Sequence, residues 1–461
     1  MFAVNPPADS VIEQYLCQKL SLSSPGQVVR TTCNANGYQS AQSSYQAITD
    51  EGEKIGIFIK TVGKQANELS KIMDKEILMY ETIIPEVTKF VERNDRDLAD
   101  QVRECFAKYY GNSREIPEIS RGDESLFLED LNQLGNFKLR EVDSKKRPDP
   151  SKATEFMKAV FNKLSLIHAS FYAWQIRCNP GSSPDEMKEK YPALINYPPV
   201  LNTQDFGDFV GGVPAERSTG KLMHIITSVA NKVLMSQIGD VEADISKQGE
   251  ILATMGKLTA IAGHLPELIA EVRNQESQFT CPILGDLNGN NIAVSTQHPG
   301  DMIFFDFGLA GFASPLMDVH WFLGEAIIYG LPDEAVKKFL DEYTVKFVAV
   351  LEKLGIKLER AALIKEFYAT KAGQHILSFM IAALAFFYKF KVKGIPAATV
   401  AVFVTNITAL NCTDDQNEIK AEIAKLLDKE EIIRLLMLLV NTLKSMEDYV
   451  GDLEMLVSEM E

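Results

Sequence analysis

Basic residues, paired cysteines and long apolar runs are all scarce in this sequence. Its 461 residues include 47 Lys and Arg against 63 Asp and Glu, which gives a net charge of -16. Because nucleic-acid phosphates are contacted by clustered Lys and Arg, this balance argues against a nucleic-acid partner. No C-x-x-C pair and no Cys/His cluster occurs among the six cysteines, which are Cys17, Cys33, Cys105, Cys178, Cys281 and Cys412. They predict the reduced thiols of a cytoplasmic protein rather than a disulfide framework or a zinc site.

No segment has the features of a signal peptide or a membrane span. Asp9 and Glu13 interrupt the N-terminal stretch where a signal peptide would be apolar. The most apolar stretch, residues 376–387, is shorter than the roughly 20 residues that cross a bilayer and predicts a buried core helix. We therefore expect no membrane partner, while the sequence leaves the oligomeric state open.

Length and hydrophobic pattern predict two lobes of unequal size. A chain this long exceeds one compact core. Short β-like runs, IGIFIKTV at 55–62 and SLFLEDL at 125–131, flank a helical pattern at 67–93. Long amphipathic helical patterns dominate from Thr154 onward, and a hairpin pattern turning at His298–Asp301 interrupts them. We expect an α+β fold with a small β-rich N-lobe and a larger, mostly helical C-lobe.

The segment LGDLNGNNIAV, followed within one hairpin by IFFDFGLAG, is the most informative part of the chain. Phosphoryl transfer needs a carboxylate that accepts the hydroxyl proton and oxygen ligands that hold Mg²⁺ against the phosphates. Asp286 is the candidate base, and Asn291 and Asp306 are the candidate metal ligands. Gly308 would permit the sharp turn that aims Asp306 into a cleft. Asp, Asn and Gly are also ordinary turn formers, but this order and spacing favour phosphoryl transfer.

These motifs resemble the ecdysteroid kinase-like (CHK kinase-like) family of the aminoglycoside phosphotransferase and choline kinase superfamily. The family pattern H-G-D-L-x-x-x-N, D-F-x and S-P-x-x-D is matched here by Gly285-Asp286-Leu287, Asn291, Asp306-Phe307-Gly308, Ser314-Pro315 and Asp318. The resemblance implies a protein-kinase-like two-lobe fold, the cofactors ATP and Mg²⁺, and a hydroxylated small molecule as substrate. It also implies a helical extension, a nucleotide-binding N-lobe, and a C-lobe with catalytic loop and acceptor site, at residues 1–30, 31–131 and 132–461.

The N-terminal part resembles the nucleotide-binding elements of the same family. FIKT resembles the strand whose lysine grips the phosphates, which implies that role for Lys60, and KEILMYETIIPE implies Glu76 as its partner, with Glu81 as the rival. NGYQSAQSSYQAI resembles the phosphate-covering loop at Gly37, although Gln42 stands where the family has serine.

The segment SLFLEDLNQLGNF resembles the family's hinge between the lobes. By that resemblance, the Glu129 carbonyl and the Leu131 amide contact the adenine. The aromatic residues that follow, in the loop at 180–214 and the helical stretch near 379–388, are compatible with an acceptor pocket for a bulky apolar alcohol. Aromatics at helical spacing are also typical of a protein core.

Leu284 departs from the family pattern, which has histidine there. An apolar leucine can fill the same space, at the loss of a hydrogen bond worth about 1 kcal/mol. The resemblance places Asp318 behind the loop, where it could compensate. His168, in LSLIHASF, matches a family histidine and is expected to be a satisfied core residue. The predicted function is ATP-dependent phosphorylation of a steroid-like or other alcohol, and the alternative is an inactive pseudokinase that binds nucleotide or ligand.

Overall fold

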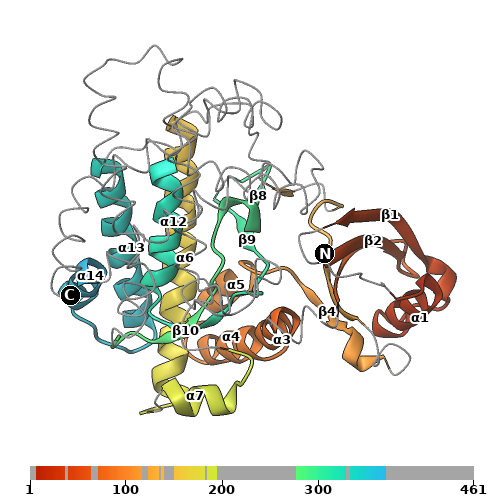
Figure 1. Cartoon of the computed structure of the whole chain (residues 1–461), viewed down its shortest axis with the longest axis horizontal. Helices are drawn as coiled ribbons and strands as arrows, with labels where there is room; N and C mark the ends of the chain where they lie inside the picture. Colours follow the sequence, from red (N-terminus) through yellow and green to blue (C-terminus); the bar gives the residue numbers. More distant parts are fainter. Residues whose placement is uncertain are drawn as a thin grey trace, which may run out of the picture. The chain divides into compact units, whose positions relative to one another are not determined.

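The computed structural model describes ten stretches of the chain, which are residues 7–36, 40–63, 71–116, 123–133, 137–139, 150–181, 184–194, 277–298, 300–328 and 333–369. The chain divides into two compact units. Figure 1 shows the described helices and strands in colour. The sheets and the residues of the candidate site belong to the first unit, which comprises Met1–Val200, Ser277–Val319 and Asp333–Tyr368.

A five-stranded antiparallel sheet forms the N-terminal part, with the strand order β1-β2-β3-β5-β4. Its strands are β1 (Val28–Asn36), β2 (Ser40–Ile48), β3 (Lys54–Val62), β4 (Tyr109–Asn112) and β5 (Glu124–Glu129). The apolar run at 55–62 thus lies in β3, and residues 125–129 of the run at 125–131 lie in β5, as the sequence predicts. Both strands sit in the interior of the sheet, where β-branched and aromatic side chains pack well.

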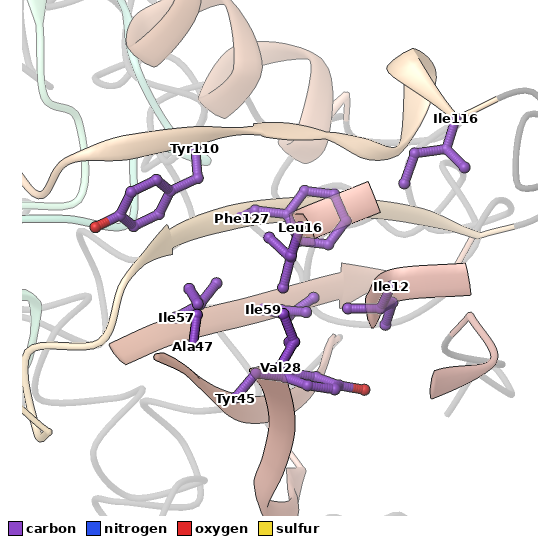
Figure 2. Packing of buried hydrophobic residues seen from close by; sticks show 10 residues of the cluster. All are labelled: Ile12, Leu16, Val28, Tyr45, Ala47, Ile57, Ile59, Tyr110, Ile116 and Phe127. Atoms are coloured by element: carbon purple, nitrogen blue, oxygen red, sulfur yellow. The ribbon is translucent and has the colours of Figure 1, made fainter. Parts of the chain in front are cut away.

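Helix α1 (Asp9–Lys19) covers one face of this sheet. Ile12 and Leu16, one helical turn apart, pack against Ile57 and Ile59 of β3 and against Phe127 of β5 (Figure 2). Because successive side chains of a strand point to opposite faces, this places the side chain after Ile59 on the other face of the sheet. That side chain is Lys60.

The described part of the connection from β3 to β4, which begins at residue 71, is mainly helical, as the pattern at 67–93 predicts; residues 67–70 of that pattern lie outside the described residues. It contains α3 (Ile72–Leu78), one wide π turn labelled η2 (Met79–Ile83), α4 (Ile84–Glu92) and α5 (Arg96–Arg103). The π turn ends two residues before Pro85, which has no N–H to donate to the carbonyl one turn earlier. The wider turn accommodates the proline while the helix continues.

Helices dominate the rest of the described chain: α6 (Pro150–Cys178), α7 (Pro184–Lys190), α12 (Leu316–Ile328), α13 (Asp333–Lys353) and α14 (Arg360–Ala369). Helices α6 and α13 run side by side (Figure 1). Phe161 of α6 stacks on Phe339 of α13 with ring centroids 5.6 Å apart. Phe339, Tyr343 and Phe347 recur every fourth residue, so they share the face of α13 that meets α6.

Two small sheets place the informative segment. The first contains β6 (Phe137–Leu139), β8 (Ile292–Ser295) and β9 (Met302–Phe304), and the second contains β7 (Cys281–Ile283) and β10 (Gly311–Ala313). Strands β8 and β9 form the predicted hairpin, whose turn is closed by a 2.8 Å bond from the Asp301 amide to the His298 carbonyl.

The described elements confirm the predicted α+β fold, with a sheet in the N-terminal part and helices in the C-terminal part. No helix in the described stretches combines the length and the apolar character that a membrane crossing needs. The predicted lobe boundaries remain predictions.

Candidate active site

Lys60 joins two carboxylates from distant parts of the chain. Its Nζ donates to Oε1 of Glu76 on α3 and, at 2.8 Å, to Oδ1 of Asp306, which follows β9. Lys60 is 9% exposed and Glu76 1% exposed. The predicted pairing of Lys60 with Glu76 is therefore present, whereas the rival Glu81 lies on the exposed side of the same helical segment.

Burial and the neighbouring charges shift the pKa values of Glu76 and Lys60. Burial raises the pKa of the Glu76 carboxyl to about 7, with Lys60 opposing the rise and Asp306 adding to it. Burial alone would lower the pKa of the Lys60 ammonium, but the Asp306 and Glu76 carboxylates together hold it above its ordinary value. Lys60 therefore remains charged, which is the state that contacts to phosphate require.

The D-F-G segment turns at Asp306, which has a positive φ of 65°. Phe307 anchors the turn, because its buried ring packs against Tyr80 at 5.0 Å and Phe106 at 5.9 Å between centroids. The expectation that Gly308 provides the sharp turn is wrong, since the left-handed residue is Asp306. Gly308 is needed for space instead: a Cβ there would lie 2.7 Å from Cγ2 of Ile72, at the start of α3.

The candidate base Asp286 lies in the loop between β7 and β8, held by two asparagine side chains. Nδ2 of Asn288 donates to its Oδ1 at 2.9 Å, and Nδ2 of Asn291 donates to its Oδ2 at 3.1 Å and to its backbone carbonyl at 2.8 Å. Burial and the nearby charge of Asp306 raise the pKa of Asp286 to about 6, against the opposing effect of both amides and Lys60. A carboxyl with such a pKa is well suited to exchange protons near neutral pH.

Asp318 holds the loop from behind, as the resemblance implies. Its carboxylate accepts the backbone N–H of Leu284 at 2.7 Å and of Gly285 at 2.9 Å. Gly285 has a φ of +88°, and a Cβ at this position would lie 1.9 Å from the Leu309 carbonyl oxygen. Leu284 fills core space and is 3% exposed. His168 is the fully buried core histidine that the sequence predicts, with both ring nitrogens bonded.

The donor set fits a magnesium ion that also binds a nucleotide. Among the described residues, no group of three or more His, Cys, Asp or Glu side chains could enclose a metal. Mg²⁺ typically takes one or two carboxylates and completes its shell with phosphate and water. The Asp306 side chain is 41% exposed. The amide nitrogen of Asn291 donates to Asp286, so the other end of this side chain, its carbonyl oxygen, points away from Asp286. Asp306 and Asn291 could hold such an ion.

The adenine and acceptor predictions are only partly within the described residues. Glu129 ends β5 and Leu131 lies buried in the turn that follows. Gly37, residues 195–214 of the loop predicted at 180–214, and the aromatic stretch near 379–388 lie outside the described part. Within the predicted loop, residues 184–190 form helix α7 instead. The nucleotide roles of Gly37, Glu129 and Leu131 remain predictions.

Three residues that hold the candidate site in place were not predicted from the sequence: Asn288, Tyr343 and Glu366. Asn288 stands beside Asn291 in the same loop, so the loop's wealth of asparagine was the available signal. Tyr343 shares the aromatic face of α13 described above, which marks a core position without indicating its hydroxyl contact. Oε1 of Glu366 accepts hydrogen bonds from Ser314 at 2.6 Å and from Ser277, and thereby anchors the start of α12, which carries Asp318.

Several solved structures resemble the chain in shape at low sequence identity. Amicoumacin kinase hAmiN, solved in complex with AMP-PNP, Ca²⁺ and Ami, is 14% identical, with a TM-score of 0.40 over 92% of this chain and 97% of that one. A putative aminoglycoside phosphotransferase from Ralstonia eutropha JMP134 is 11% identical, with a TM-score of 0.40 over 95% of this chain and 98% of that one. No protein with curated function matches the chain.

A family model decides the classification. The model described as the ecdysteroid kinase-like family matches residues 41–190 and 204–356, about two thirds of the chain. The matched region contains β3, α3, the Asp286 loop, the β8–β9 hairpin and Asp318. This chain therefore belongs to the ecdysteroid kinase-like family.

Proposed function

We propose that this chain transfers the γ-phosphate of ATP to a hydroxyl group of a small molecule, a steroid-like or other alcohol. Membership in the family indicates a small-molecule phosphotransferase. The observation that supports the finer proposal is the contact of Lys60 with both Glu76 and Asp306. It joins a strand, a helix and the D-F-G turn, the three elements that phosphoryl transfer needs in one place.

Each residue has a distinct role in this proposal. Lys60, oriented by Glu76, contacts the nucleotide phosphates. Asp306 and Asn291 hold Mg²⁺, which when bound supplies positive charge against the phosphates. Asp286 accepts the proton of the acceptor hydroxyl. The hydroxyl oxygen forms a bond to the γ-phosphorus, while the bond between the γ-phosphorus and the bridging oxygen breaks and ADP leaves.

The environment of Asp286 supports its role as base. The two amide contacts orient its carboxylate, and its pKa of about 6 leaves it deprotonated at neutral pH yet basic enough to take a proton. A positioned general base contributes about 100-fold or more to the rate.

Replacement of Asp286 by asparagine tests the proposal. Asp286→Asn keeps size and much of the hydrogen bonding but accepts no proton. We expect near-normal MgATP affinity by calorimetry, and a fall in turnover of about 100-fold or more. Turnover is measured as ATP consumption against a panel of steroids and other alcohols, with mass spectrometry identifying the compound that gains a phosphate. The matched control is Asp301→Asn in the β8–β9 turn, whose side chain is 55% exposed, and we expect it to behave as wild type.

Two outcomes would contradict the proposal. Equal turnover of the true acceptor by wild type and Asp286→Asn would remove Asp286 from the mechanism. If neither protein phosphorylated any compound while both bound MgATP, the chain would be a nucleotide-binding pseudokinase, the reading that Leu284 motivates.

A further inference from the structure

We propose that His168 and Tyr343 are positioning residues for the catalytic loop, acting through Asp318. Together they form a buried relay, defined as Tyr343, His168 and Asp318, that fixes the backbone in front of Asp286. The catalytic consequence rests on the proposed function of Asp286, whereas the effect on the loop backbone can be measured without any activity.

The relay is continuous and shielded from water. The Tyr343 hydroxyl lies 3.0 Å from Nδ1 of His168, and Nε2 of His168 lies 3.1 Å from Oδ2 of Asp318. Tyr343 and His168 are 0% exposed, and Asp318 is 1% exposed. Hydrogen bonds in such a low-dielectric setting are strong when all partners are satisfied, and costly when one is removed.

Counting donors and acceptors assigns the protons along the relay. A carboxylate only accepts, so where Asp318 is a carboxylate the Nε2 atom of His168 donates to it. In a neutral imidazole Nδ1 is then an acceptor, and the Tyr343 hydroxyl must be its donor. Burial raises the pKa of the Tyr343 hydroxyl well above its ordinary value, and the nearby charges of Cys281, Asp318 and Glu366 add to the rise. Tyr343 therefore keeps its proton, in agreement with the donor role.

The third donor matters to Asp318 because its carboxyl group is buried in the core. Buried carboxylates are tolerated when hydrogen bonds compensate the loss of water. Leu284 and Gly285 supply two backbone N–H groups on one side, and His168 supplies a ring N–H on the other. Leu284, which stands where the family has histidine, has no side-chain donor. The histidine that contacts Asp318 is His168 of α6.

The relay and the two asparagines hold opposite ends of the same short segment. Asp318 fixes the amides immediately before Asp286, and Asn288 and Asn291 fix its carboxylate. Packing in turn fixes the relay, since the Tyr343 ring meets that of His168 at 6.0 Å and that of Phe347 at 5.8 Å between centroids. Loss of the relay should therefore loosen the backbone before Asp286. The contacts of Lys60 with Glu76 and Asp306 should remain intact.

The test compares Tyr343→Phe, His168→Leu and His168→Gln in the full chain. Tyr343→Phe keeps the ring and removes one hydroxyl, so it retains the fold if His168→Leu does not. Glutamine can place an N–H donor near the position of Nε2. The matched control is Tyr172→Phe, because Tyr172 lies one turn beyond His168 on α6 and its hydroxyl donates to the Gln278 carbonyl at 3.4 Å, outside the relay.

Hydrogen exchange by mass spectrometry, on the peptide that contains Leu284 and Gly285, is the first readout. We expect exchange about tenfold faster in Tyr343→Phe and His168→Leu, the effect of losing roughly one buried hydrogen bond. His168→Gln should recover most of the protection, and Tyr172→Phe should match wild type. The second readout is steady-state ATP consumption, for which we expect kcat about tenfold lower with KM for MgATP within about twofold.

Wild-type exchange in both Tyr343→Phe and His168→Leu would overturn the proposal. So would an equal fall in kcat for Tyr172→Phe, because it would indicate general loss of packing. If Asp286→Asn retained full turnover, the proposed function would fail instead. The exchange data would then decide by themselves whether the relay holds the loop.

Discussion

Replacing Gly308 by alanine probes the contact between the D-F-G turn and helix α3. Gly308 has no left-handed φ, so its backbone accepts alanine, and the cost is steric. The new Cβ would lie 2.7 Å from Cγ2 of Ile72, where ordinary contacts begin near 3.4 Å. Ile72 is the first residue of α3 and is buried. The helix start or the turn must therefore move by about 0.7 Å.

Such overpacking typically costs about 1–3 kcal/mol of stability. It should also weaken MgATP binding, because α3 carries Glu76 and any shift of the helix changes the contact between Glu76 and Lys60. We expect a lower urea midpoint and a higher Kd for MgATP by calorimetry.

The contact itself can be isolated by a double-mutant cycle. Ile72→Ala removes the atom that the new Cβ meets, so Gly308→Ala should cost less in the Ile72→Ala background than alone, by about 1 kcal/mol or more. The control is Gly300→Ala in the β8–β9 turn, where a Cβ would meet nothing within 4 Å; its effect should stay within about 0.5 kcal/mol. If Gly308→Ala behaved as Gly300→Ala does, or if Ile72→Ala gave no relief, the steric explanation would be refuted.

Four further outcomes are expected. Asp306→Ala should abolish transfer and weaken MgATP binding while affecting ATP binding in EDTA much less, and calorimetry with and without metal checks this; equal loss in both would indicate a structural role. Lys60→Met should slow transfer without unfolding the protein, because it removes the charge and keeps the apolar stem; circular dichroism and turnover separate the two effects. Turnover should fall as the pH drops through about 6, since protonation of Asp286 removes the base. In Asn288→Ala, loss of a hydrogen bond that lowers the pKa of Asp286 should move this acidic limb to higher pH, and an unmoved limb would contradict the assignment.

Local patterns in the sequence predicted much of the fold and the identity of the main candidates. The apolar run before Lys60 predicted β3, and helical spacing predicted the segment that carries Glu76. The turn formers at His298–Asp301 predicted the hairpin that separates the Asp286 loop from Asp306. Each of these signals acts within a few residues, through side-chain alternation, helical periodicity or turn chemistry.

The sequence by itself thus determined the candidate residues of the site and the order in which they occur. Only the tertiary structure decided their contacts: that Lys60 reaches Asp306, 246 positions away, that the left-handed residue of the turn is Asp306 rather than Gly308, and that Tyr343 completes a relay to Asp318. Such contacts depend on how separate helices and strands pack. Packing is set by the combined shape of many buried side chains, so no local pattern in the sequence encodes it.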